Sequence, residues 1–155
     1  MVCRTHNACF CLQRNVIVLK YNHLSEQVVI KHMEKGNKKT LVLGASENPS
    51  RYSFLAINSL RRHQHSVEAI GRKNGKVLDV DITTEKKPLE TVDTVTLYLN
   101  PFHQKEYYEY ILSLRPKRII FNPGTENPEL YGLAKNNGIQ PLEACTLVML
   151  STGQY

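Results

Sequence analysis

The chain has 155 residues and a formal net charge of +6, from 20 Lys and Arg against 14 Asp and Glu. This length predicts one domain with a proper hydrophobic core rather than two domains. The basic balance favours an anionic partner. Because the cations are scattered and not interleaved with aromatic residues, we expect a phosphorylated small molecule rather than nucleic acid.

The composition also argues against several classes of protein. No run of about 18 apolar residues is present, so the sequence predicts no membrane-spanning segment. The four cysteines do not resemble a disulfide framework, because three lie together near the N-terminus and Cys145 lies alone near the C-terminus. We therefore expect a cytoplasmic protein with reduced thiols.

Residues 1–32 differ from the rest of the chain. Two short apolar runs, at 16–19 and 27–30, have the character of strands but lack a turn or helix that would place them in a sheet. His6, Cys9 and Cys11 lack the second ligand pair that a structural zinc site needs, so no metal is expected. We interpret residues 1–32 as an extra segment, a mis-assigned start or a loose appendage, and residues 33–155 as the domain.

From residue 40 onward, strand-like and helix-like segments alternate. Runs of β-formers predict strands at 40–43, 67–71, 77–82, 92–99, 118–121 and 139–143. Helical spacing predicts helices at 53–65, 104–114 and 128–137, and an apolar segment at 145–150 follows the last strand. This order predicts an α/β fold with a doubly wound, mainly parallel sheet and helices on both of its faces.

The first predicted strand ends in a short loop of small residues, Gly44, Ala45 and Ser46, and a helix follows soon after. Such a loop brings free backbone N–H groups and the positive end of a helix to one point, which suits a phosphate group. A turn that binds nothing has the same signature, so this loop alone does not decide the function.

The residues that follow the other strands extend the pattern. Ligands of open α/β sheets bind outside the carboxyl ends of the strands, near the point where the strand order reverses. The residues at these ends are small, polar or basic, and they predict a nucleotide cleft formed by Gly44, Ala45, Ser46, Gly71, Arg72, Lys73, Asn100, Pro101, Asn122, Pro123, Gly124 and Thr125.

The sequence departs in two ways from the dinucleotide-binding fingerprint, and both departures reduce the number of nucleotides that the site would suit. Only Gly44 is present where G-x-G-x-x-G would need three glycines. Arg72 and Lys73 stand where an Asp or Glu would bind a free ribose 2′-hydroxyl. Cations there suit a phosphorylated ribose, such as the 2′-phosphate of NADP or the 3′-phosphate of coenzyme A (CoA); a solvated basic turn is the alternative.

Several of these motifs, taken in order, resemble the small stand-alone CoA-binding proteins. Those proteins are similar to the CoA-binding, Rossmann-like domain of the succinyl-CoA synthetase α-subunit without its ligase domain. The resemblance covers about residues 36–155 and rests on residues 43–46, 48–49, 51–53, 71–72, 122–126 and 143–145. It implies that the CoA diphosphate lies over residues 44–46 with Arg51 reaching a phosphate. It also implies that Arg72 and Lys73 face the ribose phosphate or adenine, with Asn100, Pro101 and residues 122–125 lining the rest.

No catalytic residue is expected. The phosphohistidine of the synthetase belongs to the domain that this chain lacks, and the apolar setting of Cys145 favours a buried, inert thiol. His103 is an isolated loop histidine. Asp79 and Asp81 have the alternation of an exposed edge strand, which explains them as well as a metal site does. Three tyrosines at 107, 108 and 110 favour helix packing or a self-association face.

The sequence therefore predicts a domain that binds CoA or an acyl-CoA and acts as a sensor, carrier or regulatory module without chemistry of its own. An NADP-binding oxidoreductase or redox sensor is the first alternative. A protein-interaction scaffold with a vestigial cleft is the second. Homodimerisation or a protein partner is compatible with each of these.

Overall fold

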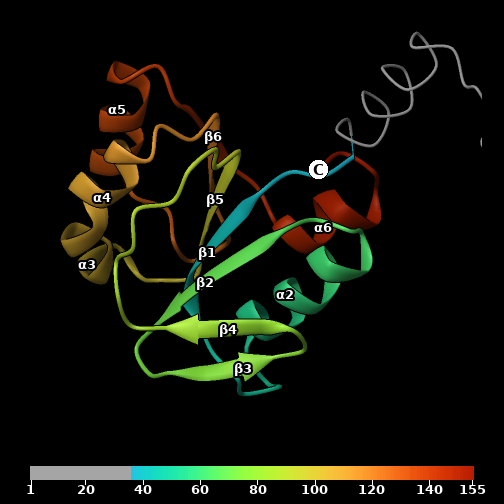
Figure 1. Ribbon diagram of the computed structural model, residues 1–155. Coiled ribbons are helices and arrows are strands. Elements are labelled where there is room, and N and C mark those ends of the chain that lie inside the picture. Colours follow the sequence, from blue (N-terminus) through green and yellow to red (C-terminus); the bar gives the residue numbers. More distant parts are fainter. Residues whose placement is uncertain (1–35) are drawn as a thin grey trace, which may run out of the picture.

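The structure of the chain is a computed structural model that describes residues 36–155 (Figure 1). The predictions for residues 1–32, including the two apolar runs and His6, Cys9 and Cys11, lie outside the described residues. The proposed domain start at Met33 stays a prediction for the same reason. Within residues 36–155, no helix combines the length and the apolar character needed to cross a bilayer.

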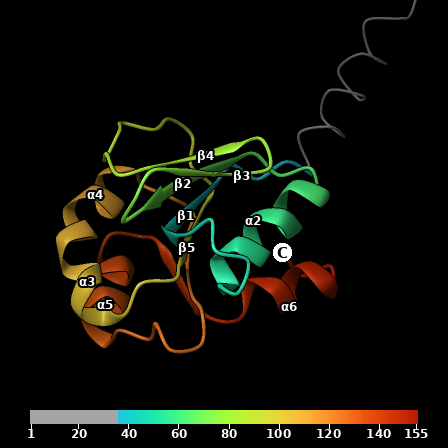
Figure 2. The same ribbon diagram turned by 90° about the horizontal axis from the view of Figure 1, so that it is seen from below.

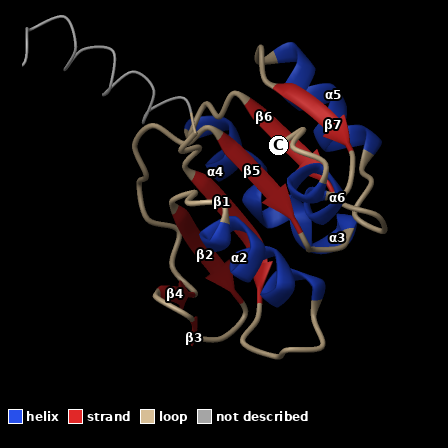
Figure 3. Ribbon diagram, turned by 90° about the vertical axis from the view of Figure 1, so that its right-hand side faces the viewer, coloured by secondary structure: helices blue, strands red, loops and turns tan. Residues whose placement is uncertain are grey.

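One seven-stranded sheet runs through the domain in the order β3-β4-β2-β1-β5-β6-β7 (Figure 3). The parallel strands are β1 (Thr40–Ala45), β2 (Val67–Gly71), β4 (Val80–Thr83), β5 (Thr94–Leu97), β6 (Arg118–Phe121) and β7 (Gln140–Glu143). Strand β3 (Gly75–Val77) pairs antiparallel with β4 at one edge. The predicted mainly parallel, doubly wound sheet is confirmed.

Helices cover both faces of the sheet (Figure 2). Helices α2 (Tyr52–Arg62) and α6 (Thr146–Ser151) lie on one face. The other face carries α3 (Pro101–Gln104), α4 (Tyr108–Ser113) and α5 (Pro128–Asn136), with a 3₁₀ turn at Lys105–Tyr107 between the first two. Side chains of a strand alternate between the two faces of the sheet, so β1 contributes to the hydrophobic core on both faces. Leu41 and Leu43 pack on the α4–α5 side, and Val42 packs on the α2–α6 side.

The prediction of one strand over residues 77–82 was wrong. The chain turns back at Leu78, which adopts a φ of +55°, and Val77 pairs with Val80 across the resulting hairpin. Asp79 at the turn is held by Arg61 of α2, whose Nε donates to Asp79 Oδ1 at 2.9 Å. Alternating apolar residues fit one long strand and two short hairpin arms equally well, so the pattern did not reveal the turn.

The prediction of one helix over residues 104–114 was also too simple. The helical segment begins at Pro101, because Asn100 caps it by accepting a hydrogen bond from the backbone N–H of His103 at 3.0 Å. It then tightens into the 3₁₀ turn before α4 begins. At the other end of the domain, the apolar segment predicted at 145–150 forms α6, which packs on the sheet through Leu150.

Tyr155 packs over the amino ends of the central strands, where it contacts Thr40 of β1 and Arg118 of β6. Its hydroxyl lies 2.6 Å from Thr40 Oγ1, and its ring packs against the Arg118 guanidinium and the His65 ring at 4.5 and 4.9 Å. His65 is 7% exposed, and its Nδ1 accepts the Lys38 backbone N–H at 3.0 Å. Burial, with Lys38 nearby, lowers the pKa of His65 from its usual 6.5.

This arrangement predicts that the domain loses stability in mild acid. A lowered pKa means that the unfolded chain binds the His65 proton more readily, so the stabilisation is complete above about pH 6.5 and is lost as the pH falls toward the folded-state pKa. Urea unfolding at pH 7.5 and pH 5.5 should show a smaller pH dependence in His65→Gln than in the wild type. An equal pH dependence of stability in both proteins would show that His65 is not the group responsible for the loss of stability in acid.

Candidate functional site

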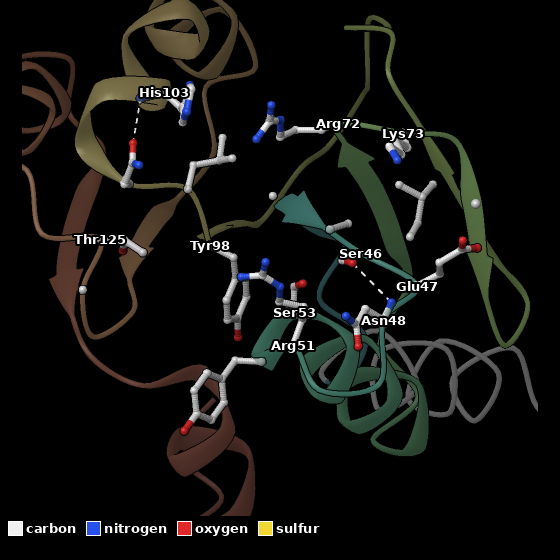
Figure 4. Close-up of a pocket in the computed structure, with 18 of the residues that line it drawn as sticks. Ser46, Glu47, Asn48, Arg51, Ser53, Arg72, Lys73, Tyr98, His103 and Thr125 are labelled. Carbon is white, nitrogen blue, oxygen red and sulfur yellow. Dashed lines mark hydrogen bonds between the residues drawn. The ribbon is translucent and has the colours of Figure 1, made fainter.

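A cleft of about 1270 Å³ opens at the carboxyl ends of the parallel strands (Figure 4). It lies where the strand order reverses, since β2 follows β1 on one side and β5 lies on the other. The loops after β1, β2, β5 and β6 and the start of α2 line it. Its volume exceeds the roughly 300–1,000 Å³ of common small-molecule pockets, so it has room for a long ligand.

Most of the residues predicted for the site line this cleft: Gly44, Ala45, Ser46, Arg51, Arg72, Lys73, Asn100, Pro123, Gly124 and Thr125. Gly71, Pro101 and Asn122 are not among the lining residues. The cleft is also lined by residues outside the predicted site, although Asn48, Tyr52 and Ser53 contributed to the family resemblance. They come from the same loops, from β3 and β4 and from the start of α2: Glu47, Asn48, Tyr52, Ser53, Asn74, Gly75, Lys76, Ile82, Tyr98, Leu99 and His103.

The loop after β1 is shaped by Gly44. Its φ is +89°, and a Cβ at this position would lie 2.8 Å from the carbonyl carbon of Tyr98. Glycine therefore lets the end of β1 turn directly against the end of β5. Beyond it, Ser46 Oγ accepts the Asn48 N–H at 3.2 Å, and Asn48 Oδ1 accepts the Ser50 N–H at 2.9 Å. The loop is thus held by its own side chains.

Helix α2 points its N-terminus at the same loop. Its N-cap residue, Arg51, makes no side-chain cap hydrogen bond, and the first turn contains no acidic residue. Without a side-chain cap, the N–H groups of Tyr52 and Ser53 and the positive end of the helix dipole remain available to an anion, whereas the Phe54 N–H donates to the Arg51 carbonyl at 3.0 Å. Figure 4 draws Arg51 among the side chains that line the cleft. The arrangement suits a phosphate or diphosphate.

The end of β2 is packed tightly under the first loop. A Cβ at Gly71 would lie 2.4 Å from the carbonyl oxygen of Ala45 and 2.7 Å from Ile82 Cγ2. Gly71 therefore supports the site from below rather than lining it. Arg72 and Lys73 follow in the exposed turn, and among the described residues neither forms an ion pair. Figure 4 shows Arg72 and His103 pointing toward one another across the cleft.

Asn122 lies in the interior, 3% exposed. Its Nδ2 donates to Thr96 Oγ1 and to the Leu97 carbonyl at 2.7 and 2.9 Å, and its Oδ1 accepts the Thr146 N–H at 2.8 Å. It therefore joins β5, β6 and α6 behind the cleft. Asn122 points toward α6 because side chains alternate between the two faces of the sheet. Phe121, the residue before it, faces the α4–α5 layer.

A second buried amide, Gln104, fixes the other wall. It is fully buried, and its Nε2 donates to the carbonyls of Leu99 and Thr125 at 2.9 and 2.7 Å. Its Oε1 accepts from Asn127 Nδ2 at 2.8 Å. The loops after β5 and β6 are thereby tied together. Sequence reasoning gave no signal for Gln104, because a glutamine on a helix is usually exposed.

The remaining candidates for chemistry do not gather in the cleft. Tyr98 lines the cleft, and burial raises the pKa of its hydroxyl far above the usual value, so it stays protonated. Cys145 is half-buried at the start of α6 and is not among the lining residues. Asp79 pairs with Arg61, and Lys76 Nζ lies 3.3 Å from Asp81 Oδ1. Residues 36–155 contain no group of three or more potential metal ligands.

Fold and cleft together define a Rossmann-like α/β protein with an open cleft at the switch point of its sheet. The family model described as a CoA binding domain matches residues 38–151. The chain belongs to this family of CoA binding domains. A search of curated proteins found no match.

Solved structures share the fold. One described as an uncharacterized protein is 54% identical in sequence, with a TM-score of 0.75 over 76% of this chain and 98% of that one. A hypothetical protein from Pyrococcus horikoshii OT3 is 20% identical, with a TM-score of 0.69 over 91% and 98% of the two chains. Cell-free ID.343 from Thermus thermophilus is 20% identical, with a TM-score of 0.66 over 84% and 98%.

Proposed function

We propose that this protein binds CoA or an acyl-CoA in the cleft and acts as a sensor, carrier or regulatory module that does no chemistry itself. The observation that carries the proposal is the position of Arg72 and Lys73. They follow β2 directly beside the loop that Gly44 shapes, where a binder of free ribose hydroxyls would have a carboxylate. This position favours a nucleotide whose ribose carries a phosphate.

The cleft residues fit CoA in their chemistry. The backbone N–H groups of the β1–α2 loop and of the first turn of α2, together with Arg51, would hold the diphosphate. Arg72 and Lys73 would hold the ribose phosphate. Asn100 and Thr125, on the opposite wall, would contact the polar pantetheine arm. When bound, CoA supplies a thiol on which an acyl group can be carried.

The distribution of reactive side chains supports a binding role. Among the described lining residues there is one histidine, His103, and one carboxylate, Glu47, and they come from different walls of the cleft. Neither side chain hydrogen-bonds to a described hydroxyl or thiol that it could activate. A module that presents or senses a CoA ester needs no such pair.

Replacing Arg72 with alanine should weaken CoA binding by about 1–3 kcal/mol, the range for a charge-assisted hydrogen bond. Titration calorimetry would measure CoA and dephospho-CoA against the wild type and the variant. The loss should be larger for CoA, because dephospho-CoA lacks the 3′-phosphate that Arg72 would contact. Arg62→Ala, an equivalent change at the exposed end of α2, is the matched control and should bind as the wild type does.

The same titration separates the alternatives. An unchanged affinity in Arg72→Ala would remove this residue from the site. Tighter binding of NADP than of CoA would favour the oxidoreductase or redox-sensor alternative, which hydride turnover would then test. No heat with either ligand would leave the interaction scaffold as the better interpretation.

A further inference from the structure

Glu47 is an unexpected residue in a site for phosphates. It is the one acidic side chain among the described residues that line the cleft, whereas Arg51, Arg72, Lys73 and Lys76 are cationic. A carboxylate at this position reduces the positive potential that attracts an anionic ligand. A role in recognising an uncharged part of the ligand would account for its presence.

The side chain of Glu47 lies against the edge of the sheet at Gly75. Its Oε2 lies 2.7 Å, and its Cδ 3.2 Å, from the position that a Cβ on Gly75 would occupy. The missing side chain at Gly75, the first residue of β3, therefore makes room for the carboxylate. Figure 4 shows Glu47 extending from the β1–α2 loop toward the β3–β4 hairpin.

Both carboxylate oxygens are free to accept hydrogen bonds from a ligand. Glu47 has no hydrogen bond or ion pair through its side chain with any described residue, and the nearby Lys76 is paired with Asp81 at 3.3 Å. The carboxylate is exposed, so it stays hydrated until a ligand covers it. It is thus an acceptor group with no structural partner.

The layout of the sheet places the base of a nucleotide beside this carboxylate. In a Rossmann-like site the diphosphate lies at the β1 loop and the ribose at the end of β2. The base then continues outward, over β4 and β3. Ile82 of β4 is 2% exposed and packs in the core, so the exposed groups at this end of the cleft are Glu47 and the start of β3. The Glu47 carboxylate lies there against Gly75.

We propose that Glu47 selects an adenine base by accepting a hydrogen bond from its 6-amino group. A 6-oxo purine presents an acceptor at the same place, and two acceptors facing each other leave both unsatisfied. The proposal rests on the proposed function, since it concerns the same ligand in the same cleft. In this proposal the purine lies at the end of the cleft near β3. The Glu47 side chain distinguishes adenine from a 6-oxo purine there.

The test compares CoA with deaminated CoA, in which the 6-amino group is replaced by an oxo group. The wild type should prefer CoA by about tenfold, as expected for one charge-assisted hydrogen bond in an open site. In Glu47→Gln the preference should fall below about threefold, because an amide can accept from the amino group or donate to the oxo group. Deaminated CoA should also bind more tightly to Glu47→Gln than to the wild type, since a repulsive charge has been removed.

Glu90→Gln is the matched control. It removes the same charge from an exposed residue between β4 and β5, outside the cleft, and should keep the tenfold preference. Equal binding of the two ligands by the wild type, or an undiminished preference in Glu47→Gln, would overturn the role of Glu47 while leaving CoA binding intact. Failure of the wild type to bind CoA at all would overturn both proposals together.

Discussion

Replacing Asn122 with alanine should lower the free energy of unfolding by about 3 kcal/mol. The side chain makes three buried hydrogen bonds that join β5, β6 and α6, and its removal leaves the Leu97 carbonyl and the Thr146 N–H short of a partner. Each buried group left unsatisfied costs about 1–3 kcal/mol. Urea unfolding followed by circular dichroism would measure the loss, with CoA absent so that ligand binding does not contribute.

Asn137→Ala provides the comparison for this variant. Asn137 is exposed at the end of α5, where its side chain donates to the Leu133 carbonyl at 2.8 Å in contact with solvent. Its replacement should cost about 0.5 kcal/mol or less. If Asn122→Ala were as stable as Asn137→Ala but bound CoA poorly, Asn122 would be a ligand residue rather than a structural one.

Replacing Gly71 with alanine should both destabilise the domain and weaken CoA binding. The added methyl group would lie within 2.4 Å of the Ala45 carbonyl oxygen and 2.7 Å of Ile82 Cγ2, so the first loop or the β3–β4 hairpin must move. Such overpacking costs about 1–3 kcal/mol. The movement also shifts the loop that would hold the diphosphate. Thermal unfolding and CoA titration on the same protein would measure the two effects.

Gly132→Ala makes the same substitution where nothing opposes it. Gly132 lies within α5, and a Cβ there would meet no atom within 4 Å. Alanine should therefore leave CoA binding unchanged and stabilise the helix by up to about 1 kcal/mol. Equal stability and equal CoA affinity in the two variants would mean that the contact at Gly71 is relieved without moving the loop.

The parts of the fold that followed from the sequence are those governed by local rules. Runs of strand-forming residues predicted the parallel strands other than β4 to within a few residues, and their alternation with helices predicted a sheet with both faces covered. The glycine after β1 and the basic pair after β2 then indicated the edge at which the cleft lies. All of these signals lie within a few neighbouring residues.

The parts that were missed depend on contacts between distant segments. The hairpin turn at Leu78 is held by Arg61 from α2, a residue 17 positions earlier in the chain. The buried position of Gln104 depends on carbonyls from two other loops. Gly71 and Asn122 were correctly placed at strand ends, but whether such a residue faces a ligand or the interior is decided by the packing around it.

The two outer strands of the sheet bear on how the protein can associate. Strand β3 has three residues and carries Lys76, and such a short, charged edge is a poor template for another strand. In β7 the N–H groups of Gln140 and Ala144 point to β6, so Pro141 faces outward and offers no donor there. Extension of the sheet by a strand from a second molecule is thus disfavoured at both edges. We therefore expect a partner that responds to a ligand in the cleft to dock on helices or on the loops around the cleft mouth, where a bound ligand can alter the protein surface.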